Sequence, residues 1–214
     1  MNESAIPIPT NCFSPKGYVK SNPASGLLAT RHGDRLIAIP EVLLRSISKT
    51  LRVETGEASY LALYTFGDSW GKNFGDRMIQ DTIKYYRQPI LETLATEFFV
   101  NVQAAWAVHG LGKPSIDFSL AERGLLVVTI ANSGIDSGKT LDNTFSYRSF
   151  SLEAGFLAGW FSTLTGNKLR ACASNWLNAP TSMQFLVGSI SHIESIERSH
   201  LQVGMLTPEM LNSL

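Results

Sequence analysis

The 214-residue sequence has little cysteine, no excess of charge of either sign and no long run of purely apolar residues. Two cysteines do not make a disulfide framework in a chain of this length, and they suit a reducing compartment. Eighteen basic residues balance eighteen acidic ones without a block of like charge, which argues against nucleic acid as a partner. The longest uncharged stretch, 171–193, is long enough to span a bilayer but rich in polar residues. We therefore expect no membrane span.

The N-terminus lacks the features of a secretory signal, because residues 1–17 contain an early acidic residue and no apolar run. We expect a cytoplasmic protein, for which peripheral contact with a membrane surface stays open. Four of the nine prolines lie within residues 1–25, where they favour extended or turn geometry over helix. We predict an N-terminal arm over residues 1–25 and a single domain over residues 26–214.

Several segments repeat apolar residues at helical spacing, and two pairs of apolar runs have the composition of hairpins. This order of elements predicts an α+β fold, with an antiparallel sheet made of hairpins packed on several long helices. The expected elements are a short strand at 34–40, helices at 41–56, 58–87 and 90–109, a hairpin of 116–120 with 124–131, a helix at 149–166, a hairpin of 167–174 with 184–191, and a helix at 191–201.

No motif selects a catalytic residue. Neither Gly-x-Ser-x-Gly nor His-Glu-x-x-His occurs, and the four histidines stand in unrelated contexts. Residues 133–140 resemble a phosphate-binding loop, but Ser133 replaces its first glycine and no helical pattern follows Lys139. We interpret this segment as a solvent loop. The whole connection from 132 to 149 is long, which is typical of a lid, a binding loop or an ordered insertion.

Two lone side chains have a structural and a functional interpretation. Cys172 alternates with Arg170 and Ser174, so we expect it on the wetter face of its strand, as a small packing residue rather than a reactive thiol. His109 precedes Gly110 at a predicted helix C-terminus, where a partly charged imidazole interacts favourably with the helix dipole. If His109 binds a metal instead, the axial position of a metal tetrapyrrole is the natural function.

Glycines lie one helical turn apart in two of the predicted helices. Gly67, Gly71 and Gly75 follow one face, and Gly155 and Gly159 follow another. Each costs about 1 kcal/mol relative to alanine in a helix interior, so something must offset the loss. Without side chains, a second helix or a flat ligand can approach closely. Tight helix packing is the favoured interpretation. Helix packing and ligand binding can also occur in different parts of one groove. Aromatic residues at helical spacing accompany these glycines: Trp70, Phe74, Phe98, Phe99, Trp106, Phe156, Trp160 and Phe161.

The pattern resembles a known family. Tyr-x-x-Gly-x-x-x-Gly (Tyr64 to Gly71), then Gly-Phe-x-x-Gly-Trp-x-x-x-x-Thr-Gly (Gly155 to Gly166) and a hairpin ending in Phe185 are similar to the 4-vinyl reductase domain, over roughly residues 35–195. The resemblance implies the fold of small core subunits of vesicle tethering complexes, dimerisation through helices and a hydrophobic ligand pocket. With the glycine and aromatic patterns, it predicts these ligand-binding residues: Tyr64, Gly67, Gly71, Phe98, Trp106, His109, Phe156, Gly159 and Trp160.

The sensor branch of this family carries a zinc site in its final hairpin, of the form Glu-x-x-Cys, seven residues, then Cys before x-Phe. Aligning on Phe185 places these cysteine and glutamate positions at Cys172, Asn175 and Met183. One thiolate beside an amide and a thioether does not hold zinc, which prefers several nitrogen or sulfur ligands. We therefore predict no metal here and a hairpin held by packing.

Three functions follow from the resemblance. The first is a non-catalytic accessory factor in photosystem II assembly, peripheral at the thylakoid membrane and forming a homo- or heterodimer, with chlorophyll or a related tetrapyrrole as its ligand. The second is a tetrapyrrole vinyl reductase, for which the sequence shows no dinucleotide fingerprint. The third is a sensor of small apolar molecules. The sequence leaves the ligand, the kind of dimer and the role of the loop before residue 149 open.

Overall fold

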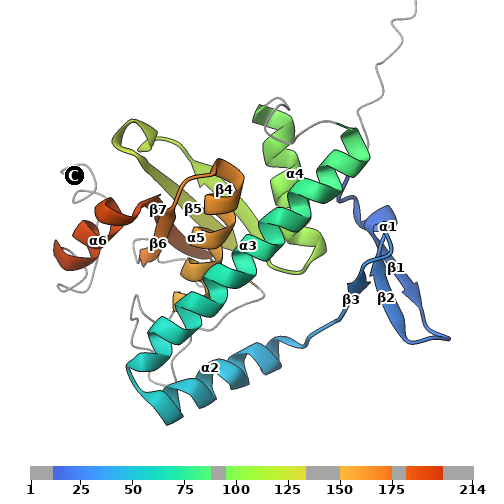
Figure 1. The fold of residues 1–214 in the computed structure, drawn as a ribbon, viewed down its shortest axis with the longest axis horizontal. Helices are drawn as coiled ribbons and strands as arrows, with labels where there is room; N and C mark the ends of the chain where they lie inside the picture. The colour runs from blue at the N-terminus through green and yellow to red at the C-terminus, as the bar shows by residue number, and fades with distance from the viewer. Residues whose placement is uncertain (1–11, 88–94, 134–149, 175–181, 200–214) are drawn as a thin grey trace, which may run out of the picture.

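The computed structural model describes residues 12–87, 95–133, 150–174 and 182–199. They form an α+β fold of helices packed on antiparallel sheets, as the sequence predicts (Figure 1). The helices are α1 (Pro15–Tyr18), α2 (Glu41–Thr55), α3 (Ala58–Tyr86), α4 (Ala95–Val108), the short 3-10 helix η2 (Ala121–Arg123), α5 (Ser151–Thr165) and α6 (Ile190–Ser199). The strands are β1 (Val19–Asn22), β2 (Leu27–Thr30), β3 (Arg35–Leu36), β4 (Lys113–Asp117), β5 (Leu125–Ala131), β6 (Leu169–Ser174) and β7 (Ser182–Ser189).

The larger sheet joins the two predicted hairpins. Its strand order is β4-β5-β7-β6, and all neighbours are antiparallel. The second strand of each hairpin lies in the middle, so β5 pairs with β7 and Val128 stands opposite Phe185. Strands β4 and β6 form the two edges. The first strand begins at Lys113 and ends at Asp117, three residues before its predicted limits, because η2 and its preceding turn take up the residues that follow.

Helix α5 is the central helix of the fold. Its residues from Ser151 to Phe161 are all buried, and it lies between the larger sheet and α3 (Figure 1). Its C-terminal cap is Gly166, whose φ of 69° is the left-handed conformation that glycine adopts most readily. The predicted helix over 149–166 is thus confirmed for its described residues. Because α5 is buried on all its faces over most of its length, it marks where the core lies.

The larger sheet is covered on both faces, which corrects the expectation for Cys172. One face packs on α5 through Ala171 and Ala173, and the opposite face packs on Ile193 and Ile196 of α6. Cys172 belongs to the second face and is only 3% exposed. The prediction that alternate residues of β6 face opposite sides of the sheet is confirmed. The expectation of a wetter face is wrong because α6, which lies just after β7, covers it.

The described part of the predicted N-terminal arm packs on the domain. Residues 12–36 form α1 and a small sheet of β1, β2 and β3. Cys12, Phe13 and Tyr18 are buried in the main core. The Tyr18 hydroxyl donates a hydrogen bond of 2.9 Å to the buried carboxylate of Asp81 on α3. Strand β3 is shorter than the strand predicted at 34–40. The domain boundary at residue 25 stays a prediction.

None of the helices in the described ranges combines the length and the apolar character needed to cross a bilayer. The phosphate-loop-like segment at 133–140 lies almost entirely outside the described residues, and so does most of the long connection that contains it.

Candidate functional site

The paired glycines lie where α3 crosses α5. A Cβ atom added at Gly67 or Gly71 would overlap the backbone carbonyl of Leu152 or Phe156 on α5. The reverse holds at Gly159, where an added Cβ would overlap the Asp68 carbonyl on α3. The two backbones therefore touch directly, which is the helix-packing interpretation of the glycine pattern. Ligand contact at these glycines stays a prediction.

Close packing of α3 and α5 brings aromatic rings together behind the crossing. The rings of Trp106 and Trp160 have centroids 5.2 Å apart, and both contact nearby rings. Phe156 lies 5.3 Å from Trp106 in an edge contact, and Phe74 lies 5.4 Å from Phe156. These four residues come from α3, α4 and α5. We call Phe74, Trp106, Phe156 and Trp160 the aromatic cluster.

Two polar groups inside the aromatic cluster lack partners. Trp106 and Trp160 are both fully buried. Their indole Nε1 atoms have no hydrogen-bond partner among the described residues. Buried tryptophan N–H groups usually find an acceptor, and leaving a buried donor unmet costs about 1–3 kcal/mol. Two unmet donors on neighbouring rings therefore mark this part of the core as unusual.

His109 borders the aromatic cluster. The sequence led us to expect a partly charged imidazole, and this expectation is wrong. Its ring packs edge-on against Phe74 and Tyr18, with centroids 5.1 and 5.4 Å away. Its Nδ1 lies 2.7 Å from the Ala105 carbonyl oxygen, to which it donates as the protonated nitrogen of the neutral ring. Burial lowers the pKa of His109 below its usual 6.5. The imidazole is therefore neutral at pH 7. A role as an axial ligand stays a prediction.

The remaining predicted site residues lie apart from the aromatic cluster. Phe98 is half-buried at the start of α4 and packs edge-on against Phe99. Tyr64 points toward the edge strand β6. The predicted site thus divides into the aromatic cluster, with His109 beside it, and a separate region around Tyr64.

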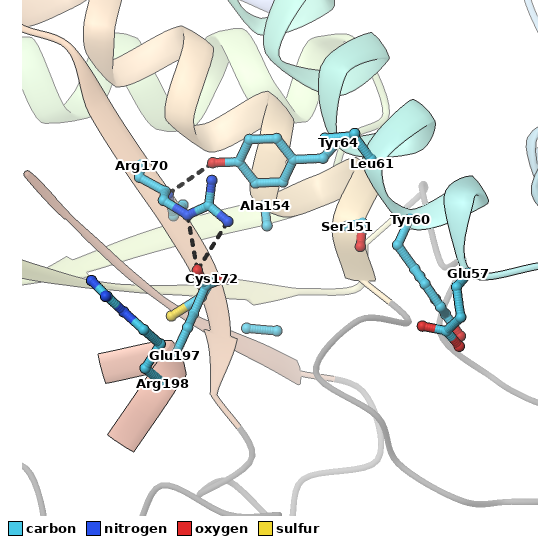
Figure 2. A pocket seen from close by; sticks show the side chains of 12 residues that line it. Glu57, Tyr60, Leu61, Tyr64, Ser151, Ala154, Arg170, Cys172, Glu197 and Arg198 are labelled. Atoms are coloured by element: carbon cyan, nitrogen blue, oxygen red, sulfur yellow. Dashed lines mark hydrogen bonds and ion pairs between the residues drawn. The ribbon is translucent and has the colours of Figure 1, made fainter. Parts of the chain in front are cut away.

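Tyr64 lines a cavity of about 460 Å³ beside β6 (Figure 2). Four elements enclose it: the start of α3, the start of α5, the middle of β6 and the end of α6. Its size lies within the usual range for small-molecule sites. The lining residues are Glu57, Tyr60, Leu61, Tyr64, Ser151, Ala154, Arg170, Ala171, Cys172, Ala173, Glu197 and Arg198.

Polar contacts tie three of these elements together (Figure 2). The Tyr64 hydroxyl accepts a 3.2 Å hydrogen bond from the Ala171 N–H. The Arg170 guanidinium lies over the Tyr64 ring, 5.1 Å from its centroid. The same guanidinium donates through Nε and Nη2 to one carboxylate oxygen of Glu197, at 3.0 and 2.9 Å. Arg170 therefore links α3 to α6 around the edge of the sheet.

Sequence analysis missed Arg170 and Glu197 as members of a site. Arg170 is the one charged residue of the short strand β6, and Glu197 lies in a tail helix 27 positions later. No local pattern connects them. Only the docking of α6 on the sheet brings the pair together.

The hairpin positions that correspond to the zinc site of the resembled family do not form a thiolate site. Burial raises the pKa of the Cys172 thiol to about 12, so it stays protonated. Met183 lies in β7, and Asn175 falls outside the described residues. Within the described ranges, no three side chains of His, Cys, Asp or Glu are grouped so that they could hold a metal ion.

No protein-family model and no curated protein matches the sequence. The fold is similar to the crystal structure of the phenol-responsive sensory domain of the transcription activator PoxR with phenol, with a TM-score of 0.57 and 12% identity over 85% of this chain and 89% of that chain. A trafficking protein particle complex subunit 3 from Naegleria fowleri, covalently bound to palmitic acid, aligns with a TM-score of 0.41 and 9% identity over 69% of this chain and 95% of that chain. The PoxR comparison confirms the predicted fold class: this chain shares the fold of a sensory domain.

Proposed function

We propose that this chain is a binding domain for small aromatic molecules that carry a hydrogen-bond acceptor, with the aromatic cluster as its site. The observation that carries the proposal is the pair of unmet indole N–H groups on Trp106 and Trp160. An acceptor oxygen that reaches either indole would satisfy its unmet N–H donor. A flat aromatic body could replace edge contacts of the kind that these rings now make with one another.

The fold similarity supports the same class of function. The PoxR sensory domain is described as phenol-responsive, and phenol is a small aromatic molecule with one oxygen. This favours the sensor interpretation of the sequence over the accessory-factor interpretation. Photosystem II assembly, pigment binding and vinyl reductase activity stay predictions.

Binding at this site requires local opening. Trp106 and Trp160 are fully buried, so a ligand reaches them only when the rings of α3, α4 and α5 separate. Such a ligand selects an open conformation that is rare without it. Association should therefore be slower than diffusion, and the ligand should stabilise the folded chain.

The test compares phenol with toluene, which has nearly the same shape but no acceptor. We expect phenol to raise the melting temperature and to bind about tenfold more tightly than toluene, as measured by calorimetric titration. Trp160→Phe and Trp106→Phe each remove one donor, and each should reduce the preference for phenol. Equal affinity for phenol and toluene, or no binding of either, would overturn the proposal.

We also propose a second copy of the chain as a partner. Segment 37–66 exposes apolar side chains of α2, of the chain before it and of the start of α3, and such clusters on soluble proteins usually mark interfaces. A helical interface agrees with the dimerisation that the family resemblance implies. We call this set the α2 surface: Ile37, Ile39, Val42, Leu43, Ile47, Val53, Leu61 and Phe66.

A further inference from the structure

The cavity beside β6 is a second concave site, separate from the aromatic cluster. Of the residues in the predicted site it shares only Tyr64. Its ionisable lining contains the carboxylates of Glu57 and Glu197 and the guanidinium groups of Arg170 and Arg198. The charges of these two carboxylates and two guanidinium groups sum to zero. The Arg170 charge is moreover already met by Glu197, so an anion approaching Arg170 would have to compete with this pair.

The edge of β6 offers main-chain hydrogen bonding to the cavity. The N–H groups of Leu169 and Ala171 point away from β7, because Ser162 Oγ accepts from the first at 2.9 Å and the Tyr64 hydroxyl from the second at 3.2 Å. Backbone groups in an antiparallel strand alternate between the two sides. The N–H and C=O groups of Ala173 therefore also point away from β7, and Ala173 lines the cavity. Edge groups of this kind are ready partners for an added amide.

The Tyr64 hydroxyl provides a directed donor in the same cavity. It accepts from Ala171, and its own hydrogen has no acceptor among the described residues. Burial raises the pKa of Tyr64 to about 12, so the hydroxyl keeps its proton at neutral pH. The Arg170 guanidinium over the ring and the Ala171 hydrogen bond both restrict the side chain. The donor is thus in place before a ligand arrives, which lowers the entropy cost of binding.

We propose that this cavity binds an uncharged molecule carrying an amide group. The amide carbonyl accepts from the Tyr64 hydroxyl, and the amide N–H donates to a main-chain carbonyl at the edge of β6. The apolar part of the ligand lies against Leu61 and Ala154, which line the cavity beside these groups. This site requires neither the unmet indoles nor the function proposed for them.

The test uses three probes of one shape and different charge. Benzamide is neutral, benzoate is an anion and benzamidinium is a cation. With the full chain at pH 7, we expect benzamide to bind at least tenfold more tightly than either ion, measured by calorimetric titration. Tighter binding of benzoate would indicate an anion site at Arg170, and tighter binding of benzamidinium a cation site at the carboxylates. Either result, or no benzamide binding, would overturn the proposal.

Substitutions locate the bound benzamide. Tyr64→Phe removes only the hydroxyl, and should weaken binding roughly 2- to 12-fold. Tyr85→Phe, outside the cavity, is the matched control and should leave binding unchanged. Leu61→Trp places a larger side chain at the exposed rim of the cavity and should weaken binding at least tenfold, which keeps the test decisive if Tyr64→Phe does not fold, because Leu61 is exposed. Trp160→Phe should lower phenol binding but not benzamide binding, so failure at one site does not imply failure at the other. Benzamide binding that survives both Tyr64→Phe and Leu61→Trp would place the probe elsewhere.

Discussion

The glycines of α3 and α5 show how a missing side chain can be a structural requirement. In an exposed helix interior, glycine to alanine stabilises by about 1 kcal/mol. At Gly71 and Gly159 the added methyl group meets backbone of the other helix instead, and backbone cannot rotate away. At this crossing, glycine to alanine should therefore destabilise the protein instead of stabilising it.

We predict that Gly71→Ala and Gly159→Ala each lower the free energy of unfolding by about 3 kcal/mol, at the upper end for overpacked cores. The measurement is urea denaturation of the full chain. Gly75→Ala is the matched control on the same face of α3. Its added Cβ would meet mainly the Thr163 side chain, at 3.0 Å, so its loss should be smaller. Equal effects at all three positions would argue against direct contact of the two helix backbones.

Cys172 gives a prediction for alkaline pH. Burial raises the pKa of its thiol from 9.0 to about 12, so above pH 9 the unfolded chain loses this proton while the folded chain keeps it. The stability from the buried neutral thiol is full below pH 9 and falls as pH rises toward 12, by about 1.4 kcal/mol per pH unit. Between pH 9 and pH 11, wild type should lose about 2 kcal/mol more than Cys172→Ala, measured by urea denaturation. Parallel pH profiles would contradict the burial of Cys172.

At the scale of elements, a buried hydrogen bond to a carboxylate helps to hold the N-terminal sheet on the domain. Tyr18, at the end of α1, donates to Asp81 in α3, and both side chains are fully buried. Arg77 reaches from α3 to the same carboxylate, 3.7 Å away, and also pairs with Asp34 in the loop between β2 and β3. Beside the packing of Cys12, Phe13 and Tyr18 in the core, the N-terminal segment is thus attached to α3 through a buried hydrogen bond and a partly exposed ion pair.

Tyr18→Phe keeps the ring but removes the donor to a buried carboxylate. We expect a loss of about 2 kcal/mol in the free energy of unfolding, because hydrogen bonds to charged groups contribute roughly 1.5–3 kcal/mol. Limited proteolysis should cut the chain near β1 faster than in wild type. Asp34→Asn breaks only the partly exposed pair and should cost less than about 1 kcal/mol. If Asp34→Asn is the more harmful change, the buried contact is not what anchors this sheet.

The elements themselves could be predicted wherever the pattern is local. Helix α5 is mostly apolar and ends at a glycine, and both hairpins of the larger sheet have short apolar runs on either side of a break. Their arrangement was not predictable, since nothing in the sequence says that β5 pairs with β7. The covered second face of β6 was missed for the same reason: it depends on where α6 docks.

At the scale of the whole molecule, the sequence identified the residues of the aromatic cluster but not how they meet. Trp106, Phe156 and Trp160 were predicted from spacing and resemblance, and the structure brings their rings together. Tyr64 was predicted with them, yet it belongs to the cavity at the sheet edge. That division follows from the path of α3, which places Tyr64 beside β6 and Phe74 against the rings of α5. Periodicity alone cannot show it.

The α2 surface leads to the last prediction, which concerns association of two chains. Helix α2 buries only Ser48 among its residues, while Leu43 and Ile47 are each 46% exposed one turn apart. Leaving this much apolar surface in water is unfavourable at about 25 cal/mol per Å², so a partner should cover it. Wild type is expected to sediment as a dimer at micromolar concentration in analytical ultracentrifugation.

Charge placed within the α2 surface should separate the two chains. Leu43→Asp combined with Ile47→Asp is expected to shift the sedimentation to a monomer while the helix content measured by circular dichroism stays the same, because neither side chain is buried in the single chain. Asn73→Asp combined with Gln80→Glu adds the same two charges at exposed polar positions of α3, outside the α2 surface, and should leave the dimer intact. A wild-type monomer at all concentrations, or a dimer that tolerates both aspartates, would show that two copies do not meet through α2.

Because the dimer would bury Leu61 at the rim of the β6 cavity, benzamide affinity should also differ between the double variant and wild type if the two sites are linked through this residue.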